Sequence, residues 1–330
     1  MAKINLYNHQ PFPETIHRWG WNGVTRLILK HFHDEKAEVM LDGMIEHTFN
    51  VGRCKKMNFG RFPHMNHKWI SMFHNPCTSL GPNGFRWEQN IFSLYGNKHY
   101  RAFMENCIGL ITFSKSYAEK AKNSLSHLDI DLPVGFVHHP SEECEVKFNL
   151  ENFGRRVIHV GWWLRDFDSF FRLKTNYKKV VLGGPDRYGQ DPYFLKNTNL
   201  KTRHKQNNIH WENYLSNTGY DKIMSESVVF LDLYDSIANN AVVECISRQT
   251  PILVNPIDSV VEYLGKDYPF YYYSLDEAAE KLEDDDLIKE TSEYLKSRQR
   301  VVSKEKFVTD LDRVLEVFLQ KKIELSYFIV

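Results

Sequence analysis

One segment of the sequence, residues 234–246 (YDSIANNAVVECI), combines residue types that can bind a phosphate and a sugar. Ala238, Asn239 and Asn240 stand where we expect a helix to begin directly after a strand. The first amides of a helix lack intrahelical acceptors and the helix dipole adds partial positive charge, so a phosphate there gains about 0.3–2 kcal/mol. Glu244, one turn further on, can accept hydrogen bonds from both hydroxyls of a ribose.

A purely structural role explains the same residues. Asn239 or Asn240 can simply cap the helix, and Glu244 can pair with Arg248 at i, i+4 on the helix surface. Such a surface pair contributes only about 0.3–0.5 kcal/mol, which is a weak reason to place a glutamate there. Both interpretations stay open from the residues alone.

Two further strand ends add candidates for a ligand site. After the strand expected at 156–161, Gly161 allows close backbone approach and Arg165 can bind a diphosphate through two hydrogen bonds. Arg165 can instead pair with an aspartate that follows it, and Trp163 either packs or stacks on a ligand. Gly183, at the end of the next expected strand, completes the set. Ligands of open α/β sheets bind beyond the carboxyl ends of the strands, which favours these positions.

A histidine, His74, follows the strand expected at 68–73. An imidazole at this place can act as a general base, bind a sugar hydroxyl, or serve only a structural role. The sequence holds 15 histidines but no H-E-x-x-H, and it also lacks a Walker A sequence, G-x-S-x-G and G-x-G-x-x-G. Metalloprotease, P-loop NTPase and serine hydrolase functions are therefore disfavoured, and no metal site is assigned.

Alternating strands and helices position these residues. In the second half, β-rich runs at 156–161, 180–184, 228–233, 251–255 and 269–273 alternate with helical stretches at 166–173, 220–225, 240–248, 259–264 and 275–282. This alternation predicts βαβ units with right-handed crossovers in a doubly wound parallel sheet. Beyond residue 287, apolar residues recur at helical spacing toward an apolar end (residues 327–330), which we expect to dock on a domain.

The first half is less regular but shows the same elements. Strands are expected at 68–73, 108–113 and 134–138, with Ser114 capping a helix over 115–125. The polar segment 141–154 is the best candidate for a linker between domains. The sequence therefore predicts two α/β domains, 1–150 and 151–330.

Composition limits the classes of function. The 330 residues carry 42 Lys and Arg against 42 Asp and Glu, so the chain has no excess of positive charge for nucleic acid. No apolar run reaches the roughly 18–20 residues that span a bilayer, and the N-terminus does not resemble a signal peptide. The five cysteines form no C-x-x-C motif. We expect a cytoplasmic protein without a disulfide framework, and its lack of a membrane span is compatible with peripheral membrane contact.

Four segments together carry a resemblance to a known family: 107–115 (CIGLITFSK), 136–140 (FVHHP), 159–165 (HVGWWLR) and 235–246 (DSIANNAVVECI). The chain resembles GT-B glycosyltransferases, and it is most similar to a group found in large DNA viruses and bacteria. The resemblance covers about residues 69–283. It implies two Rossmann-like domains facing across a cleft, with the nucleotide sugar held mainly by the second domain and the acceptor by the first. It also implies that a C-terminal helix crosses back to the first domain.

By the same resemblance, Glu244 binds ribose, the amides around 238–241 hold phosphate, and Arg165 neutralises the leaving diphosphate without a metal or other cofactor. Many retaining members carry a pair of glutamates, E-x7-E, but Ser236 stands eight residues before Glu244. Asp235 is the nearest candidate for the role of the first glutamate. An inverting reaction requires a base, for which His74 is the candidate, whereas in a retaining enzyme His74 binds sugar. The stereochemical outcome stays open.

The expected function is transfer of a sugar from a nucleoside diphosphate sugar to a glycan, a lipid-linked acceptor or a protein. A nucleotide-sugar 2-epimerase resembles the same fold, and it would isomerise the donor without an acceptor. The departure at Ser236 also keeps a binding module without catalysis as an alternative.

Overall fold

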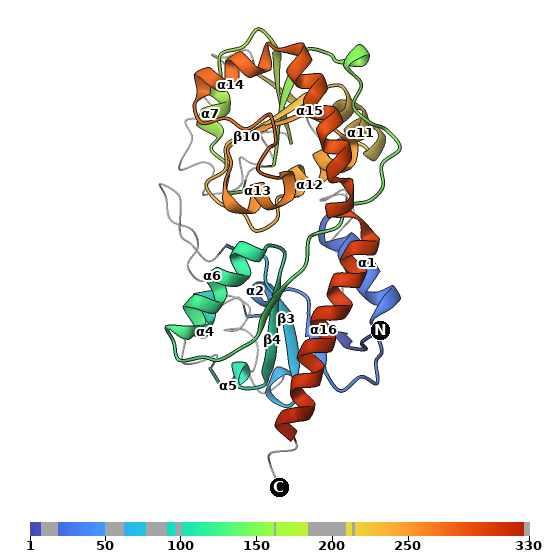
Figure 1. Ribbon diagram of the computed structural model, residues 1–330, viewed down its shortest axis with the longest axis vertical. Coiled ribbons are helices and arrows are strands. Elements are labelled where there is room, and N and C mark those ends of the chain that lie inside the picture. Colours follow the sequence, from blue (N-terminus) through green and yellow to red (C-terminus); the bar gives the residue numbers. More distant parts are fainter. Residues whose placement is uncertain are drawn as a thin grey trace. The chain divides into compact units, whose positions relative to one another are not determined.

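The computed structural model in Figure 1 describes residues 1–7, 19–49, 63–76, 91–96, 101–161, 163–183, 209–212 and 215–326. The described chain forms two compact units: unit 1 holds the residues up to Pro140 together with 303–326, and unit 2 holds Ser141–Val302. The expected boundary at 150/151 thus lies inside unit 2. Segment 141–154, which we expected to be a linker, is bound to unit 2 by backbone bonds such as Phe148 N to Arg248 O, 2.8 Å.

Unit 1 is built on a parallel sheet in the order β1-β2-β3-β4-β5. Its strands are β1 (Asn5–Tyr7), β2 (Met40–Asp42), β3 (Trp69–Met72), β4 (Cys107–Thr112) and β5 (Val134–Phe136). The strands expected at 68–73, 108–113 and 134–138 are confirmed. Because all strands run in the same direction, the residues that follow β2, β3, β4 and β5 lie along one edge of the sheet.

Six described α-helices complete unit 1: α1 (Gly20–His31), α2 (Ile45–Thr48), α4 (Ile91–Tyr95), α5 (Arg101–Met104), α6 (Lys115–Ser126) and α16 (Lys304–Ser326). The hydroxyl of Ser114 accepts from the amide of Tyr117 at 3.3 Å, so the expected cap of α6 is confirmed. In α16 the predicted apolar face is also confirmed, since Phe307, Leu311, Leu315 and Phe318 are buried.

Helix α16 packs against β4 and β5 of unit 1, as Figure 1 shows for the long red helix beside the strands. Two glycines make room for it. A Cβ atom on Gly109 would lie 2.4 Å from the ring of Phe318, and one on Gly135 would lie 2.7 Å from Val314. The absence of side chains at these two positions therefore lets the helix approach the sheet closely.

Gly109→Ala is expected to lower the free energy of unfolding by about 1–3 kcal/mol, because the added methyl group overpacks the contact with Phe318. Urea unfolding of the two proteins measures this difference. In a Phe318→Ala background the ring is gone, so the cost of Gly109→Ala should fall close to zero. An equal cost in both backgrounds would show that the contact is not the cause.

Unit 2 contains a second parallel sheet, in the order β10-β9-β6-β7-β8. Its strands are β6 (Arg156–Val160), β7 (Lys178–Leu182), β8 (His210–Glu212), β9 (Val228–Leu231) and β10 (Ile252–Val254). The chain runs outward from β6 to β8 and then returns to the other side of β6 as β9. The strand order therefore reverses between β6 and β9, and in open α/β sheets ligands bind beyond this point.

The described α-helices of unit 2 are α7 (Phe167–Arg172), α11 (Asn217–Ser225), α12 (Asn240–Arg248), α13 (Asp258–Leu264), α14 (Leu275–Leu282) and α15 (Asp285–Arg298). All five helices expected between 166 and 282 are confirmed. The strand expected at 269–273 is wrong, because only a single bridge joins Tyr271 to Val254. Phe270, Tyr271 and Tyr272 pack into the core instead of extending the sheet, and the hydroxyl of Tyr272 donates to Leu231 O at 3.1 Å.

The expected fold class is confirmed: the described chain is α/β, with two Rossmann-like units and C-terminal helices. None of the described helices has both the length and the apolar character needed to cross a bilayer.

Candidate functional site

The loops that follow β6 and β9 are joined to each other at the carboxyl edge of the unit 2 sheet. Arg165 and Leu233 form an isolated antiparallel bridge, and the amide of Tyr234 donates to the carbonyl of Leu164 at 3.0 Å. The side chain of Asn255, just after β10, bonds both the amide and the carbonyl of Leu233, at 2.8 and 2.9 Å. These backbone bonds hold the two loops in register at the point where the strand order reverses.

Arg165 lies between these loops and the start of α12. Its Nη1 donates to Trp163 O at 2.7 Å, and its Nη2 donates to the side-chain oxygen of Asn239 at 3.1 Å. Gly161 adopts φ +74°, and a Cβ atom there would lie 3.0 Å from the guanidinium. Glycine is thus required at this position by both the backbone conformation and the space that the guanidinium occupies. The structure brings together Gly161 and Arg165, predicted from one segment, and Asn239, predicted from another.

The amino end of α12 is partly satisfied by its own cap. The side-chain oxygen of Asn239 accepts from the amides of Ala241 and Val242, at 3.0 and 3.4 Å. The amide of Ala241, one of those expected to hold a phosphate, therefore already has an acceptor. The amides of Ala238 and Asn240 have none in the part of the chain that the structure describes. Together with the guanidinium, these two amides can supply donors to an anion.

Glu244 is only 8% exposed and accepts a hydrogen bond from the hydroxyl of Tyr220. The alternative of a surface ion pair with Arg248 is wrong, because Arg248 is fully buried. The guanidinium of Arg248 bonds the carboxylates of Asp221 (2.7 Å) and Glu142 (3.3 Å), and it donates to the backbone oxygen of Glu244 at 3.5 Å. The carboxylate of Glu244 is thus held by α11 rather than by its own helix.

The remaining candidates of unit 2 lie at the same edge of the sheet. Trp163 is 37% exposed, and Gly183 follows β7 with its amide bonded to Glu212 O at 2.9 Å. Asp235 is buried, and its carboxylate accepts from the amide of Ser236 at 2.8 Å. Asp235 therefore contributes to the shape of the loop before α12, and its assignment to catalysis stays a prediction.

His74 follows β3 in unit 1, and its ring is fixed by several contacts. Nε2 donates to Gly43 O at 2.9 Å, and the rings of Trp21 and Phe113 lie with their centroids 4.7 and 5.0 Å away. Burial lowers the pKa of His74 to about 3. The imidazole is therefore neutral near pH 7, with its proton on Nε2 and a lone pair on Nδ1. A group with so low a pKa is a poor general base near pH 7, but its Nδ1 lone pair can still accept a hydrogen bond.

Glu46, in α2, is a buried carboxyl group that sequence reasoning missed. Its Oε1 accepts from the amides of His74 and Asn75, each at 2.7 Å. Its Oε2 has no hydrogen-bond partner among the described residues, and the side chain is 2% exposed. Burial, reinforced by the charge of Asp42, raises the pKa of Glu46 to about 7 against the opposing effect of the amides. Glu46 thus fixes the turn in which His74 lies.

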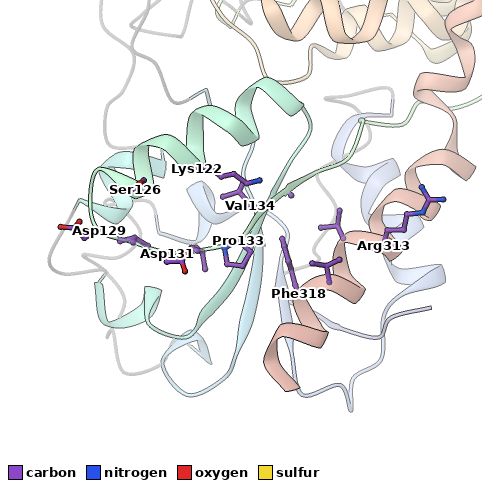
Figure 2. Close-up of a pocket in the computed structure, with 13 residues that line it drawn as sticks. Lys122, Ser126, Asp129, Asp131, Pro133, Val134, Arg313 and Phe318 are labelled. Carbon is purple, nitrogen blue, oxygen red and sulfur yellow. The ribbon is translucent and has the colours of Figure 1, made fainter. Parts of the chain in front are cut away.

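A metal centre and a separate pocket are two alternatives to the candidate site in unit 2, where the strand order reverses. Within the described residues, no group of three or more His, Cys, Asp or Glu side chains could hold a metal ion. A pocket of about 920 Å³ lies in unit 1 between the end of α6, β5 and α16 (Figure 2). Lys122 and Val134 line one side of it, and Arg313 and Phe318 line the other. None of the predicted site residues belongs to this pocket.

No family model and no curated protein matches the sequence. Solved structures do match the fold. TarM of S. aureus, solved as a mutant in complex with fondaparinux, alpha-GlcNAc-glycerol and UDP, has a TM-score of 0.58 at 13% identity, covering 84% of this chain and 55% of that chain. A UDP-forming alpha,alpha-trehalose-phosphate synthase from Burkholderia xenovorans has a TM-score of 0.59 at 11% identity, covering 84% and 73%. Sucrose-phosphate synthase from Thermosynechococcus elongatus has 0.53 at 12%, covering 89% and 75%.

These neighbours are glycosyltransferases of the GT-B class, so the chain has the GT-B fold. It spans about half the length of TarM.

Proposed function

We propose that this chain is a glycosyltransferase that moves a sugar from a nucleoside diphosphate sugar to a glycan, a lipid-linked acceptor or a protein. One observation carries the proposal: Arg165, the start of α12 and Glu244 lie together where the strand order of the unit 2 sheet reverses. A guanidinium and free amides suit a diphosphate, and a carboxylate one turn along the helix suits a ribose.

In this proposal the positive charge that stabilises the leaving diphosphate comes from the protein. The guanidinium of Arg165 and the amides of Ala238 and Asn240 donate to the developing negative charge as the bond to the sugar breaks. This supply of donors supports a reaction that needs no metal ion. The fold neighbours support a uridine nucleotide as the first donor to test, since TarM was solved with UDP and the trehalose-phosphate synthase is described as UDP-forming.

Unit 1 supplies the acceptor side of the proposal. The lone pair of His74 Nδ1 can accept a hydrogen bond from a sugar hydroxyl, because Nε2 donates to Gly43 O. The low pKa of His74 argues against its role as the base that an inverting reaction requires. We therefore assign His74 to sugar binding, which favours the retaining alternative.

Arg165→Ala and Glu244→Ala are each expected to weaken nucleoside diphosphate binding about 10- to 100-fold, since each removes charge-assisted hydrogen bonds. A thermal-shift panel of UDP, GDP, ADP, CDP and dTDP, with and without magnesium, first identifies the nucleotide that stabilises the wild type. Isothermal titration calorimetry then gives its dissociation constant for each variant.

The matched control is Lys178→Ala, which removes an exposed cation at the amino end of β7, at the opposite edge of the same sheet. Its affinity should equal that of the wild type. If both site variants bound the nucleoside diphosphate as tightly as the wild type, the assignment of Arg165 and Glu244 to the nucleotide site would be contradicted. A donor sugar that is isomerised in the absence of any acceptor would instead identify a 2-epimerase.

A further inference from the structure

Two neighbouring residues of α11 contact two residues of α12 that lie one turn apart. The hydroxyl of Tyr220 donates to Oε2 of Glu244, and the carboxylate of Asp221 accepts from Nε and Nη2 of Arg248, at 3.0 and 2.7 Å. The guanidinium of Arg248 also lies over the ring of Tyr220, 5.6 Å from its centroid. Helix α11 therefore holds α12 at two points, and one of them is the carboxylate that we assign to ribose binding.

The bond from Tyr220 has a fixed direction. Burial and the charge of Glu244 raise the pKa of Tyr220 well above its ordinary value, so the hydroxyl keeps its proton and remains the donor. A glutamate side chain in solution samples many rotamers, and a ligand that binds it has to restrict them. Because Tyr220 fixes one carboxylate oxygen, much of that restriction is already present before a ligand arrives.

The hydrogen bond from Tyr220 is compatible with a ligand on the same carboxylate. An ionised carboxyl group has two oxygens with about four lone pairs, so the hydrogen bond from Tyr220 does not by itself exclude further donors. Two vicinal hydroxyls bind a carboxylate best when both of its oxygens are held in a defined plane. If the carboxylate is no longer held in this plane, binding of the ribose diol is weakened. Binding of the diphosphate is not, because the diphosphate is held elsewhere, at Arg165 and the start of α12.

We propose that Tyr220 is a positioning residue that sets specificity for the intact ribose diol: it orients Glu244 so that the protein prefers ribonucleotides to 2′-deoxyribonucleotides. The inference rests on the proposed function, because it takes Glu244 as the ribose-binding residue. It predicts a selective effect, confined to the sugar of the nucleotide.

Calorimetric titration of the wild type, Tyr220→Phe and Glu244→Gln tests the proposal. The probes are the tightest-binding ribonucleoside diphosphate of the panel UDP, GDP, ADP and CDP, and its 2′-deoxy counterpart. We expect the wild type to prefer the ribonucleotide at least tenfold, and Glu244→Gln to lose this preference. Tyr220→Phe should reduce the preference about three- to tenfold while its affinity for the 2′-deoxynucleotide changes less than about twofold.

Tyr271→Phe is the matched control. It also removes one tyrosine hydroxyl from unit 2, which donates to Gly265 O at 2.9 Å, and it should keep the full ribose preference. If Tyr220→Phe kept the full preference for the ribonucleotide, the inference would be overturned but the proposed function would not. The same holds for an equal loss of affinity for both nucleotides, because a merely structural role of Tyr220 predicts that result. A wild type that binds none of the nucleotides would overturn both the inference and the proposed function.

Discussion

The Arg248→Ala variant should lose about 3–5 kcal/mol of unfolding free energy, the largest effect that we expect from a single substitution in unit 2. Arg248 is fully buried, and its guanidinium pairs with Asp221 and Glu142. Removal of the cation leaves the buried carboxylate of Asp221 without that counterion and opens a cavity where the side chain was. Urea unfolding followed by circular dichroism measures the loss.

Two variants make this result specific. Arg248→Lys retains the charge but lacks the planar donor group that bonds Asp221 through two nitrogens, so an intermediate loss is expected. Arg300→Ala removes an exposed arginine and should change the unfolding free energy by less than about 0.5 kcal/mol. A loss for Arg248→Ala no larger than that of Arg300→Ala would contradict the structural importance of the buried pair.

The Glu46→Gln variant should be more stable than the wild type at alkaline pH. The pKa of Glu46 is raised to about 7 in the folded chain from an ordinary value of 4.5, chiefly by burial. The folded state therefore binds the proton more tightly than the unfolded state does. The contribution of Glu46 to the wild-type free energy of unfolding is therefore fully present below the ordinary pKa. As the pH rises to about 7, this contribution of about 3 kcal/mol is lost. Glutamine keeps an oxygen that can accept from the amides of His74 and Asn75, but it never ionises.

Urea unfolding of wild type and variant between pH 5 and pH 8 tests this prediction. The difference between the two proteins should grow with pH and level off above pH 7. Glu35→Gln, at an exposed position of the same unit, should show no such trend. A difference that stays constant over this range would mean that Glu46 does not titrate there.

The sequence predicted four of the five strands in the unit 2 sheet, β6, β7, β9 and β10, because most of their residues are buried and apolar. Runs such as 228–231 (VVFL) contain no polar residue, and the intervening helices carry their own caps. The helix expected at 240–248 has those bounds in the structure, since Asn239 caps its start and Gln249 ends it in a left-handed conformation. By contrast, β1 and β2 of unit 1 and β8 of unit 2, which have three residues each, were missed.

The candidate site was only partly predictable for a different reason. Gly161 and Arg165 were found together because they follow one strand, and Asn239 was found separately because it precedes a helix. Glu46 and Tyr220 matter through contacts with residues 28 and 24 positions away in the chain, and neither lies at a strand end. Local pattern and propensity contain no information about such pairs. Only the packing of α2 against the turn after β3, and of α11 against α12, makes them visible.

The membership of α16 in unit 1 has a consequence for biosynthesis. Unit 2 is continuous in the described chain from Ser141 to Val302, whereas unit 1 lacks α16 until residues 304–326 have been translated. Domains generally fold as units while the ribosome adds residues from the N-terminus. In a nascent chain, the faces of β4 and β5 at Gly109 and Gly135 therefore stay uncovered while unit 2 is synthesised. The residues of unit 1 up to Pro140 are therefore made before unit 2, but their fold is completed only after it.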